Sequence, residues 1–476
     1  MQLPIKDMSP ISAARLSEPP NRSRQRILLV AGIVAYVACS QWMYVNYLYP
    51  NWAYFGFDYN APTAKYLVLA WTLSLLPSLW MPIELARPSQ LAYWVLYIVT
   101  YIPSMFIPLY ININPPSEIS FVMIVFFVGF VLTGLSYLLP LLPLRPVRIS
   151  RKTFWWTFGC LAAGFTIWMI AVFHGHMQIV SFGDIYTQRN AAGELAEGSA
   201  VFFAIMGLTG AINPFLMGCG LYYRRRWLFL AGVAGQLLVF SVLGTKGSIL
   251  SIVFVPGVYA VLRIGRSPFG LKITYACLAL LVGSCLAYVF AGEDPGPFLF
   301  VVLFLVLMRT LPMGGLVTAW YYNFFQQNPL TYYSHVTGVN WFVHYPYANF
   351  IGLEIGSFYQ TGSDLDATAH FWAMDGLEAL GLPGVLVISV FCALVFWALD
   401  SAAQRHDPRL AALVITYATY NLANISMFTS LFSGGLILLI LFLYMLQPRK
   451  GMEFASSLAG AGVLTSVPPA APSFPG

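Results

Sequence analysis

The hydrophobic pattern of the chain is a series of apolar runs, each about as long as a helix that crosses a membrane. The runs lie at about 27–49, 65–83, 91–110, 119–142, 154–173, 200–222, 227–244, 248–263 and 273–291, and further runs lie within 376–447. About 20 apolar residues in a helix span the hydrocarbon core of a bilayer. The pattern therefore predicts an all-α, polytopic integral membrane protein with about 12 transmembrane helices.

Composition supports this class and excludes an ordinary soluble domain. Hydrophobic residues make up 59% of the chain, charged residues only 9%, and the mean hydropathy is +0.72. A soluble domain carries roughly 25% charged residues. The net charge of +6 does not indicate nucleic acid as a partner, because the basic residues fall in short clusters between the apolar runs. Such clusters are typical of cytoplasmic loops.

The basic clusters predict the orientation and the domains. Four arginines precede the first run, and further clusters follow the fourth, sixth and eighth runs. By the positive-inside rule these ends are cytoplasmic. The predicted parts are a cytoplasmic tail (1–26), a membrane domain (27–316) with an outer loop (174–199), an extracytoplasmic insert (317–375), C-terminal transmembrane helices (376–447) and a disordered cytoplasmic tail (448–476).

The segment 298–315 does not fit a simple count of crossings. Glu293 and Asp294 precede it on the outer side, and Arg405 and Arg409 place the end of the run at 376–399 in the cytoplasm. If 298–315 crossed fully, the insert would begin on the wrong side of the membrane. Either this segment is re-entrant, which we favour, or 336–358 crosses back. Irregular backbone at membrane depth is tolerated where it lines a cavity.

Three cations are expected on the outer side: Arg189 in the outer loop, Lys246 in a glycine-flanked turn (GTKGS), and Arg309 inside apolar sequence. An arginine at bilayer depth costs about 3 kcal/mol or more and usually faces a cavity and a negative group. We interpret the three as an anion site for phosphate groups. Alternatively, Arg309 pairs with Glu293 or Asp294, Lys246 lies in an ordinary outer turn, and Arg189 is a solvated loop charge.

Aromatic side chains with polar edges are concentrated in the insert and suit the faces of sugar rings. The predicted substrate-binding residues are Tyr186, Tyr321, Tyr322, Tyr332, Tyr333 and Trp372. Tyrosine and tryptophan also form belts at membrane interfaces, and this alternative stays open.

Candidate acids and bases lie in the same region. His335 and Asp375 are the first candidates for catalysis, followed by His370 and Glu378. Asp375 and Glu378 are three residues apart and share one face of a helix. The six cysteines lie in apolar runs without a CxxC pair, so the sequence predicts no metal site and no cofactor.

Several motifs in the C-terminal two-thirds resemble those of bacterial oligosaccharide repeat-unit polymerases, the Wzy-like enzymes of O-antigen and exopolysaccharide synthesis. They are DIYTQRN (184–190), TKG (245–247), RTLPMGG with YYNFF (309–325), NPLTYYSH (328–335) and HFWAMDGLEALGLPGVL (370–386). Each motif is weak alone, and the resemblance rests on their order and spacing over about 200 residues.

The resemblance implies an enzyme of the inner membrane with an active site that faces the periplasm, and an architecture like that of GT-C glycosyltransferases. The growing glycan would pass from undecaprenyl pyrophosphate to an incoming lipid-linked repeat unit. Expected partners are undecaprenyl-pyrophosphate-linked oligosaccharides, membrane lipid and a possible chain-length regulator protein. The alternatives are an O-antigen ligase-like glycosyltransferase, a polytopic transporter and an acyltransferase.

Overall fold

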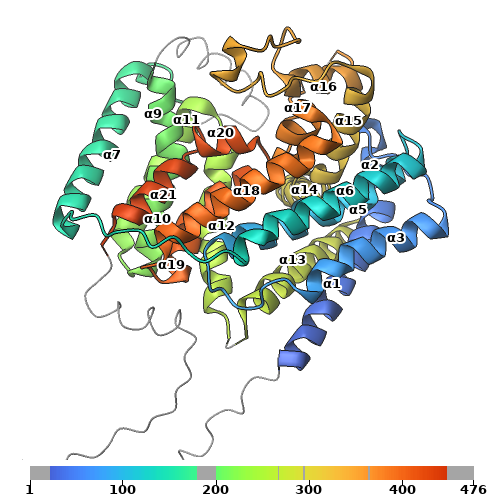
Figure 1. The fold of residues 1–476 in the computed structure, drawn as a ribbon, viewed down its shortest axis with the longest axis horizontal. Helices are drawn as coiled ribbons and strands as arrows, with labels where there is room; N and C mark the ends of the chain where they lie inside the picture. The colour runs from blue at the N-terminus through green and yellow to red at the C-terminus, as the bar shows by residue number, and fades with distance from the viewer. Residues whose placement is uncertain (1–21, 179–199, 266, 293–294, 363–364, 448–476) are drawn as a thin grey trace, which may run out of the picture.

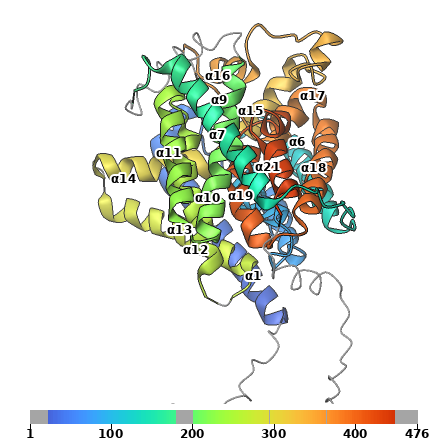
Figure 2. The same ribbon diagram turned by 90° about the vertical axis from the view of Figure 1, so that its left-hand side faces the viewer.

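A computed structural model describes residues 22–178, 200–265, 267–292, 295–362 and 365–447. Every regular element in these ranges is a helix (Figure 1, Figure 2). The α-helices are α1 (Arg22–Met43), α2 (Tyr49–Trp52), α3 (Ala64–Leu75), α4 (Ser89–Val95), α5 (Ile102–Ile111), α6 (Pro116–Gly134), α7 (Arg151–Phe173), α9 (Val201–Gly207), α10 (Asn213–Tyr222), α11 (Arg226–Leu243), α12 (Lys246–Arg263), α13 (Phe269–Ala291), α14 (Gly296–Leu303), α15 (Met313–Gln327), α16 (Ile351–Tyr359), α17 (Glu378–Leu380), α18 (Leu382–Ala403), α19 (Pro408–Leu422), α20 (Met427–Leu431) and α21 (Leu436–Met445). Short π-helical or 3-10 segments are η1 (Tyr44–Leu48), η2 (Ala53–Phe55), η3 (Leu76–Leu79), η4 (Leu96–Tyr101), η5 (Leu135–Tyr137), η6 (Leu208–Ile212), η7 (Phe304–Thr310), η8 (Val339–Trp341) and η9 (Trp372–Leu377).

The number of membrane-crossing helices is lower than expected. In the described ranges, 10 helices are long and apolar enough to cross a membrane, or up to 11 if one bent pair counts as a single span. The prediction of an all-α polytopic membrane protein is confirmed, and the count of about 12 was too high. The run at 65–83, expected to be a span, contains a shorter apolar helix, Ala64–Leu79. Helix α19 has only 15 residues and carries buried Thr416 and Thr419.

Hydrogen bonds tie the basic segments together at one end of the bundle, which we call the basic face. The Arg26 guanidinium donates to the carbonyl of Met81, 2.8 Å away. In the segment that follows Met81, the Arg87 guanidinium donates to the carbonyls of Ser136 and Leu139, and Arg405 donates to the carbonyl of Leu144 at 2.5 Å. Helix α1 begins at the lower edge of the molecule in both views, and α16 lies at the upper edge (Figure 1, Figure 2). The face opposite the basic face therefore carries α16.

The segment around 298–315 continues into a buried helix. Gly296–Thr310 and Met313–Gln327 are bent by 43° at the break between them, and they form either a broken span or a re-entrant loop. Nearly all of α15 is buried, including Trp320 and Tyr321. The buried face of this helix continues to Phe325, beyond the predicted start of the insert at residue 317.

The alternative in which 336–358 crosses the membrane is also wrong. This stretch contains only the three-residue η8 and most of the nine-residue α16. Neither reaches the roughly 20 residues that a helix needs to span a bilayer. Residues 328–350, which we call the outer segment, instead lie over the upper end of the bundle near α16 (Figure 1).

Short helices at the C-terminal end place polar groups inside the bundle. The Asp407 side chain accepts a hydrogen bond from the backbone N–H of Arg409 and caps α19, with Pro408 in the first turn. Helix α19 ends at Leu422, and α20 starts after Ser426, whose hydroxyl caps it. Helices that end within the bundle leave backbone groups and polar side chains facing a shared interior space.

Candidate functional site

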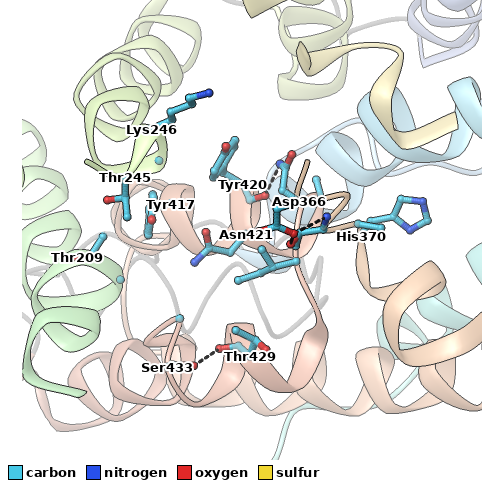
Figure 3. A pocket seen from close by; sticks show the side chains of 18 of the residues that line it. Thr209, Thr245, Lys246, Asp366, His370, Tyr417, Tyr420, Asn421, Thr429 and Ser433 are labelled. Atoms are coloured by element: carbon cyan, nitrogen blue, oxygen red, sulfur yellow. Dashed lines mark hydrogen bonds between the residues drawn. The ribbon is translucent and has the colours of Figure 1, made fainter. Parts of the chain in front are cut away.

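A polar pocket lies where these short helices meet the turn between α11 and α12 (Figure 3). Its volume is about 270 Å³, near the lower limit of about 300 Å³ for small-molecule sites. The lining comes from the α9–η6 segment, residues 244–247, η7 with α15, residues 366–370, and the stretch from α19 to residue 434. Segments more than 200 residues apart in the sequence thus build one site.

Two of the predicted cations, Lys246 and Arg309, line this pocket. Gly244 ends α11 with a φ of 61°, a left-handed conformation that glycine adopts without a steric penalty, and Lys246 opens α12 directly afterwards. Arg309 lies half-buried in the π-helical turn η7. Within the described ranges no carboxylate forms an ion pair with Arg309. Its expected alternative partners, at 293 and 294, lie outside those ranges.

Hydroxyl and amide side chains make up much of the remaining lining. They are Thr209, Thr245, Thr368, Tyr417, Tyr420, Asn421, Asn424, Thr429 and Ser433. In Figure 3, Tyr420 and Asn421 lie between Lys246 on one side and Thr429 with Ser433 on the other. Sequence reasoning missed the residues from α19, although TYATYNLANIS (416–426) carries an unusual density of polar groups for a buried helix.

His370 belongs to the pocket lining, but its imidazole is engaged in the protein interior. Its Nε2 lies 3.0 Å from the Thr318 hydroxyl and 3.2 Å from the carbonyl oxygen of Gly314, and the Ala373 N–H donates to its Nδ1. The side chain is 1% exposed, and burial lowers the pKa of His370 to about 4. A neutral ring with both nitrogens engaged positions the 366–370 wall, and it is poorly placed to act as a base.

Asp366 is the one carboxylate among the described residues that line the pocket. Its Oδ1 accepts from the backbone N–H of Thr368, 3.0 Å away, and from the Thr368 hydroxyl. This local turn fixes the carboxylate in the segment before η9. Asp366 does not cap the following helix, which starts several residues later, at Phe371.

The other predicted acids and bases form a second cluster. His335 Nε2 lies 3.1 Å from Asp375 Oδ1, and His335 Nδ1 lies 3.1 Å from Glu378 Oε1. The contact between His335 and Glu378 is an ion pair that lacks the alignment of a hydrogen bond. Neither carboxylate oxygen of Glu378 makes a hydrogen bond to the described residues. Burial acts to lower the pKa of His335, but the two carboxylates outweigh it and raise the pKa to about 10. The two carboxylates therefore favour the imidazolium form of His335 at neutral pH, although burial also raises the pKa of Glu378.

The five predicted substrate-binding aromatic residues that the structure describes fall into two groups, and neither group lines the pocket. Trp372 and Tyr321 are fully buried: the indole N–H of Trp372 donates to the Ser389 hydroxyl, and its ring packs against Phe126 and Phe130. Tyr322 is also buried. For these three, packing replaces the expected contact with a sugar, because no exposed face remains.

Tyr332 and Tyr333 belong to the outer segment. Tyr332 is 56% exposed, and Tyr333 packs beside His335 and Phe428. Both lie next to the cluster of His335 and its carboxylates rather than in the pocket. Arg189 and Tyr186 lie outside the described residues.

Comparison with known proteins gives no relative: no family model, curated protein or solved structure matches the chain. Function is therefore inferred from the pocket, its charges and the sequence motifs.

Proposed function

We propose that the chain is a membrane-embedded glycosyltransferase that polymerises lipid-linked oligosaccharide repeat units for a surface or secreted polysaccharide. One observation carries the proposal. Three motifs on which the resemblance to repeat-unit polymerases rests, TKG, RTLPMGG and HFWAMDG, contribute Lys246, Arg309 and His370 to one polar pocket. Motifs that are weak separately gain weight when they share a site.

The two cations suit a pyrophosphate leaving group. Arginine binds phosphate oxygens through paired N–H donors, and lysine acts as a compact point charge. Lys246 and Arg309 line the same pocket, and Arg309 has no carboxylate partner among the described residues. The two cations would stabilise the negative charge that develops as the bond between the anomeric carbon and the pyrophosphate oxygen breaks. Preorganised charge of this kind is usually a large contribution to catalysis.

The hydroxyl and amide groups of α19 and of Asn424, just after it, suit a sugar. Tyr417 and Tyr420 stack with ring centroids 6.1 Å apart and offer flat faces, and Asn421 and Asn424 offer hydrogen-bonding edges. In the proposed step, the acceptor hydroxyl oxygen attacks the anomeric carbon, Asp366 takes the hydroxyl proton, and undecaprenyl pyrophosphate leaves. The volume of about 270 Å³ holds the reacting groups, while the rest of the glycan extends outside.

The proposed location is the bacterial inner membrane, with the basic face in the cytoplasm and the opposite face toward the periplasm. The gathering of Arg26 and Arg405 at one end supports this orientation through the positive-inside rule. Lipid-linked repeat units would be presented at the periplasmic side, and a chain-length regulator protein would be a further partner.

A transporter is the second candidate, because broken helices around a polar site near the middle of the bundle are typical of transporters. Here α19, α20 and α21 are short, and the pair of α14 and α15 is bent. An O-antigen ligase-like enzyme would use the same lipid-linked donor.

Deletion of the gene in its host separates these functions. The proposed polymerase predicts that single repeat units accumulate on the lipid. Long lipid-linked chains that are not attached to a lipid A core would support a ligase, and unchanged glycans would contradict both enzymes.

Arg309 gives the sharper test in the same strain. Arg309→Ala should lower chain extension by about 10²–10³-fold, as expected for loss of one group that stabilises developing charge. Arg309→Lys should retain part of the activity. Arg263→Ala, at the exposed end of α12, is the matched control and should extend chains normally. Normal polymer with Arg309→Ala, at normal protein level, would refute the anion site.

A further inference from the structure

Three segments far apart in the sequence meet around His335. The turn after α15 supplies His335, η9 and α17 supply Asp375 and Glu378, and the start of α20 supplies Ser426 and Met427. The Ser426 hydroxyl donates to Asp375 Oδ1 at a distance of 2.6 Å, and the Met427 N–H donates to Asp375 Oδ2 at 2.5 Å. We call His335, Asp375 and Glu378 the clamp.

The clamp concentrates charge in the interior. Asp375 and Glu378 are both 0% exposed, and His335 is the described cation that faces them. Tyr333 and Tyr345 lie nearby with neutral phenols, because burial and the carboxylates raise their pKa values. A buried charge that loses its partner is strongly destabilising, by about 3–5 kcal/mol. The segment that carries His335 is therefore held firmly against η9.

The backbone beside His335 is held in an unfavourable conformation. Tyr332 and Tyr333 have φ values of 49° and 64°, a left-handed region that costs a residue with a side chain about 1–2 kcal/mol. The Thr331 N–H donates to the carbonyl of Glu378, and the Tyr332 N–H donates to the carbonyl of Ala379, both at a distance of 3.0 Å. Strained backbone persists only where surrounding contacts enforce it. Here these two hydrogen bonds and the clamp enforce it.

The clamp reaches the pocket through one wall. Asp375 binds Ser426 and Met427, and the pocket-lining residues Ile425 and Thr429 flank this pair. The Ser426 hydroxyl also accepts from the Thr429 N–H over 3.3 Å. Asp375 is thus bonded directly to the start of the helix that carries the pocket-lining residue Thr429.

We infer that His335 is a positioning residue: through Asp375 it ties the outer segment to the start of α20 and so fixes the pocket wall that carries Thr429. Its two ring nitrogens both face carboxylates, so the imidazolium has no free lone pair for a substrate proton. The tie itself does not depend on which substrate the pocket takes. Its consequence for glycan synthesis rests on the proposed function.

The test measures the pocket wall directly. Thr429→Cys in the full-length chain, reconstituted in nanodiscs, is labelled with a membrane-impermeant methanethiosulfonate, and the chain without this cysteine gives the background from the native cysteines. Adding His335→Ala should change the labelling rate by about tenfold or more, because a lost buried ion pair opens the segment locally. His344→Ala is the matched control, since His344 lies exposed in the same outer segment. It should stay within about twofold of the parent rate.

Two further variants separate positioning from proton transfer. His335→Lys keeps a cation but offers no base at neutral pH, and it should restore most of the labelling rate and part of the chain extension. If His335→Ala does not fold, Glu378→Gln weakens the same tie from its other side and should shift labelling in the same direction. If His335→Ala is labelled at the parent rate, the tie is overturned. Where His335→Ala does not fold, the same result in Glu378→Gln overturns it. A labelling change with unaltered polymer would instead leave the tie standing and contradict the proposed function.

Discussion

Gly210→Ala gives a test of how tightly the pocket is built. Gly210 lies in η6 and packs directly against Gly434, which lies in the break between α20 and α21. Both glycines line the pocket. A Cβ added at Gly210 would lie 2.2 Å from the carbonyl oxygen of Gly434 and 2.6 Å from its carbonyl carbon. Both atoms belong to the backbone, so η6 and the break must move apart. Overpacking of this kind costs about 1–3 kcal/mol.

Thermal unfolding of the purified chain in detergent measures this cost. Gly210→Ala should lower the midpoint by several degrees and also lower chain extension, because the displaced segment carries Ser433 on the pocket wall. Gly164→Ala is the matched control: it lies within α7, and an added Cβ would meet nothing within 4 Å. There alanine should be neutral or stabilise the helix by up to about 1 kcal/mol. If Gly210→Ala melts at or above the wild-type midpoint, the close approach of η6 to the break is refuted.

Three further predictions follow from the clamp and from His370. Asp375→Asn should lower the unfolding midpoint by an amount that corresponds to about 1.5–3 kcal/mol, because the amide loses the charge that pairs with His335 and has only one oxygen to accept the hydrogen bonds from Ser426 and Met427; an unchanged midpoint would count against the clamp. The pKa of His335 is raised from 6.5 to about 10, so its contribution to stability is complete below about pH 6.5 and is lost as pH rises to about 10; the midpoint should fall over this range, and less so in His335→Gln. His370→Ala should lower stability by about 1–3 kcal/mol, because Gly314 and Thr318 lose their partner, while the pH profile of chain extension keeps its shape; a profile that loses one limb would reassign His370 as a base.

The membrane architecture was predictable because it depends on local composition. Apolar runs and basic clusters are read along the chain, and Arg26, Arg87 and Arg405 make their contacts at one end of the bundle. Which side of the membrane this end faces stays a prediction. The convergence of Lys246 and Arg309 on one pocket was also expected from topology. An arginine inside apolar sequence and a lysine in a glycine-flanked turn are chemically conspicuous, so their sequence positions alone marked them.

The pocket wall from α19 was less predictable. Tyr420 and Asn421 lie in a helix shorter than a typical span, and nothing in their local pattern tells which neighbour they face. Likewise, Trp372 and Tyr321 carry polar edges that suit a sugar, but their rings are buried by helices distant in sequence. Burial depends on tertiary packing, which a single sequence does not reveal.

The acids and bases show the same limit. His335 and Asp375 were chosen for their chemistry, and the structure brings them to 3.1 Å across 40 residues of sequence. Their mutual contact changes the interpretation, since an imidazole between two carboxylates becomes a cation. Asp366, by contrast, lies in the pocket and is the better candidate base.

Reconstitution of the purified chain tests the central claim most directly. Lipid-linked repeat units extracted from the deletion strain are incubated with the full-length chain in liposomes, and the products are resolved by gel electrophoresis and mass spectrometry. The proposal predicts a ladder of lipid-linked glycans that grows by one repeat unit per step, with release of undecaprenyl pyrophosphate, and no ladder with Arg309→Ala. Repeat units that stay single with the wild-type chain, or that merely cross the bilayer unchanged, would contradict it.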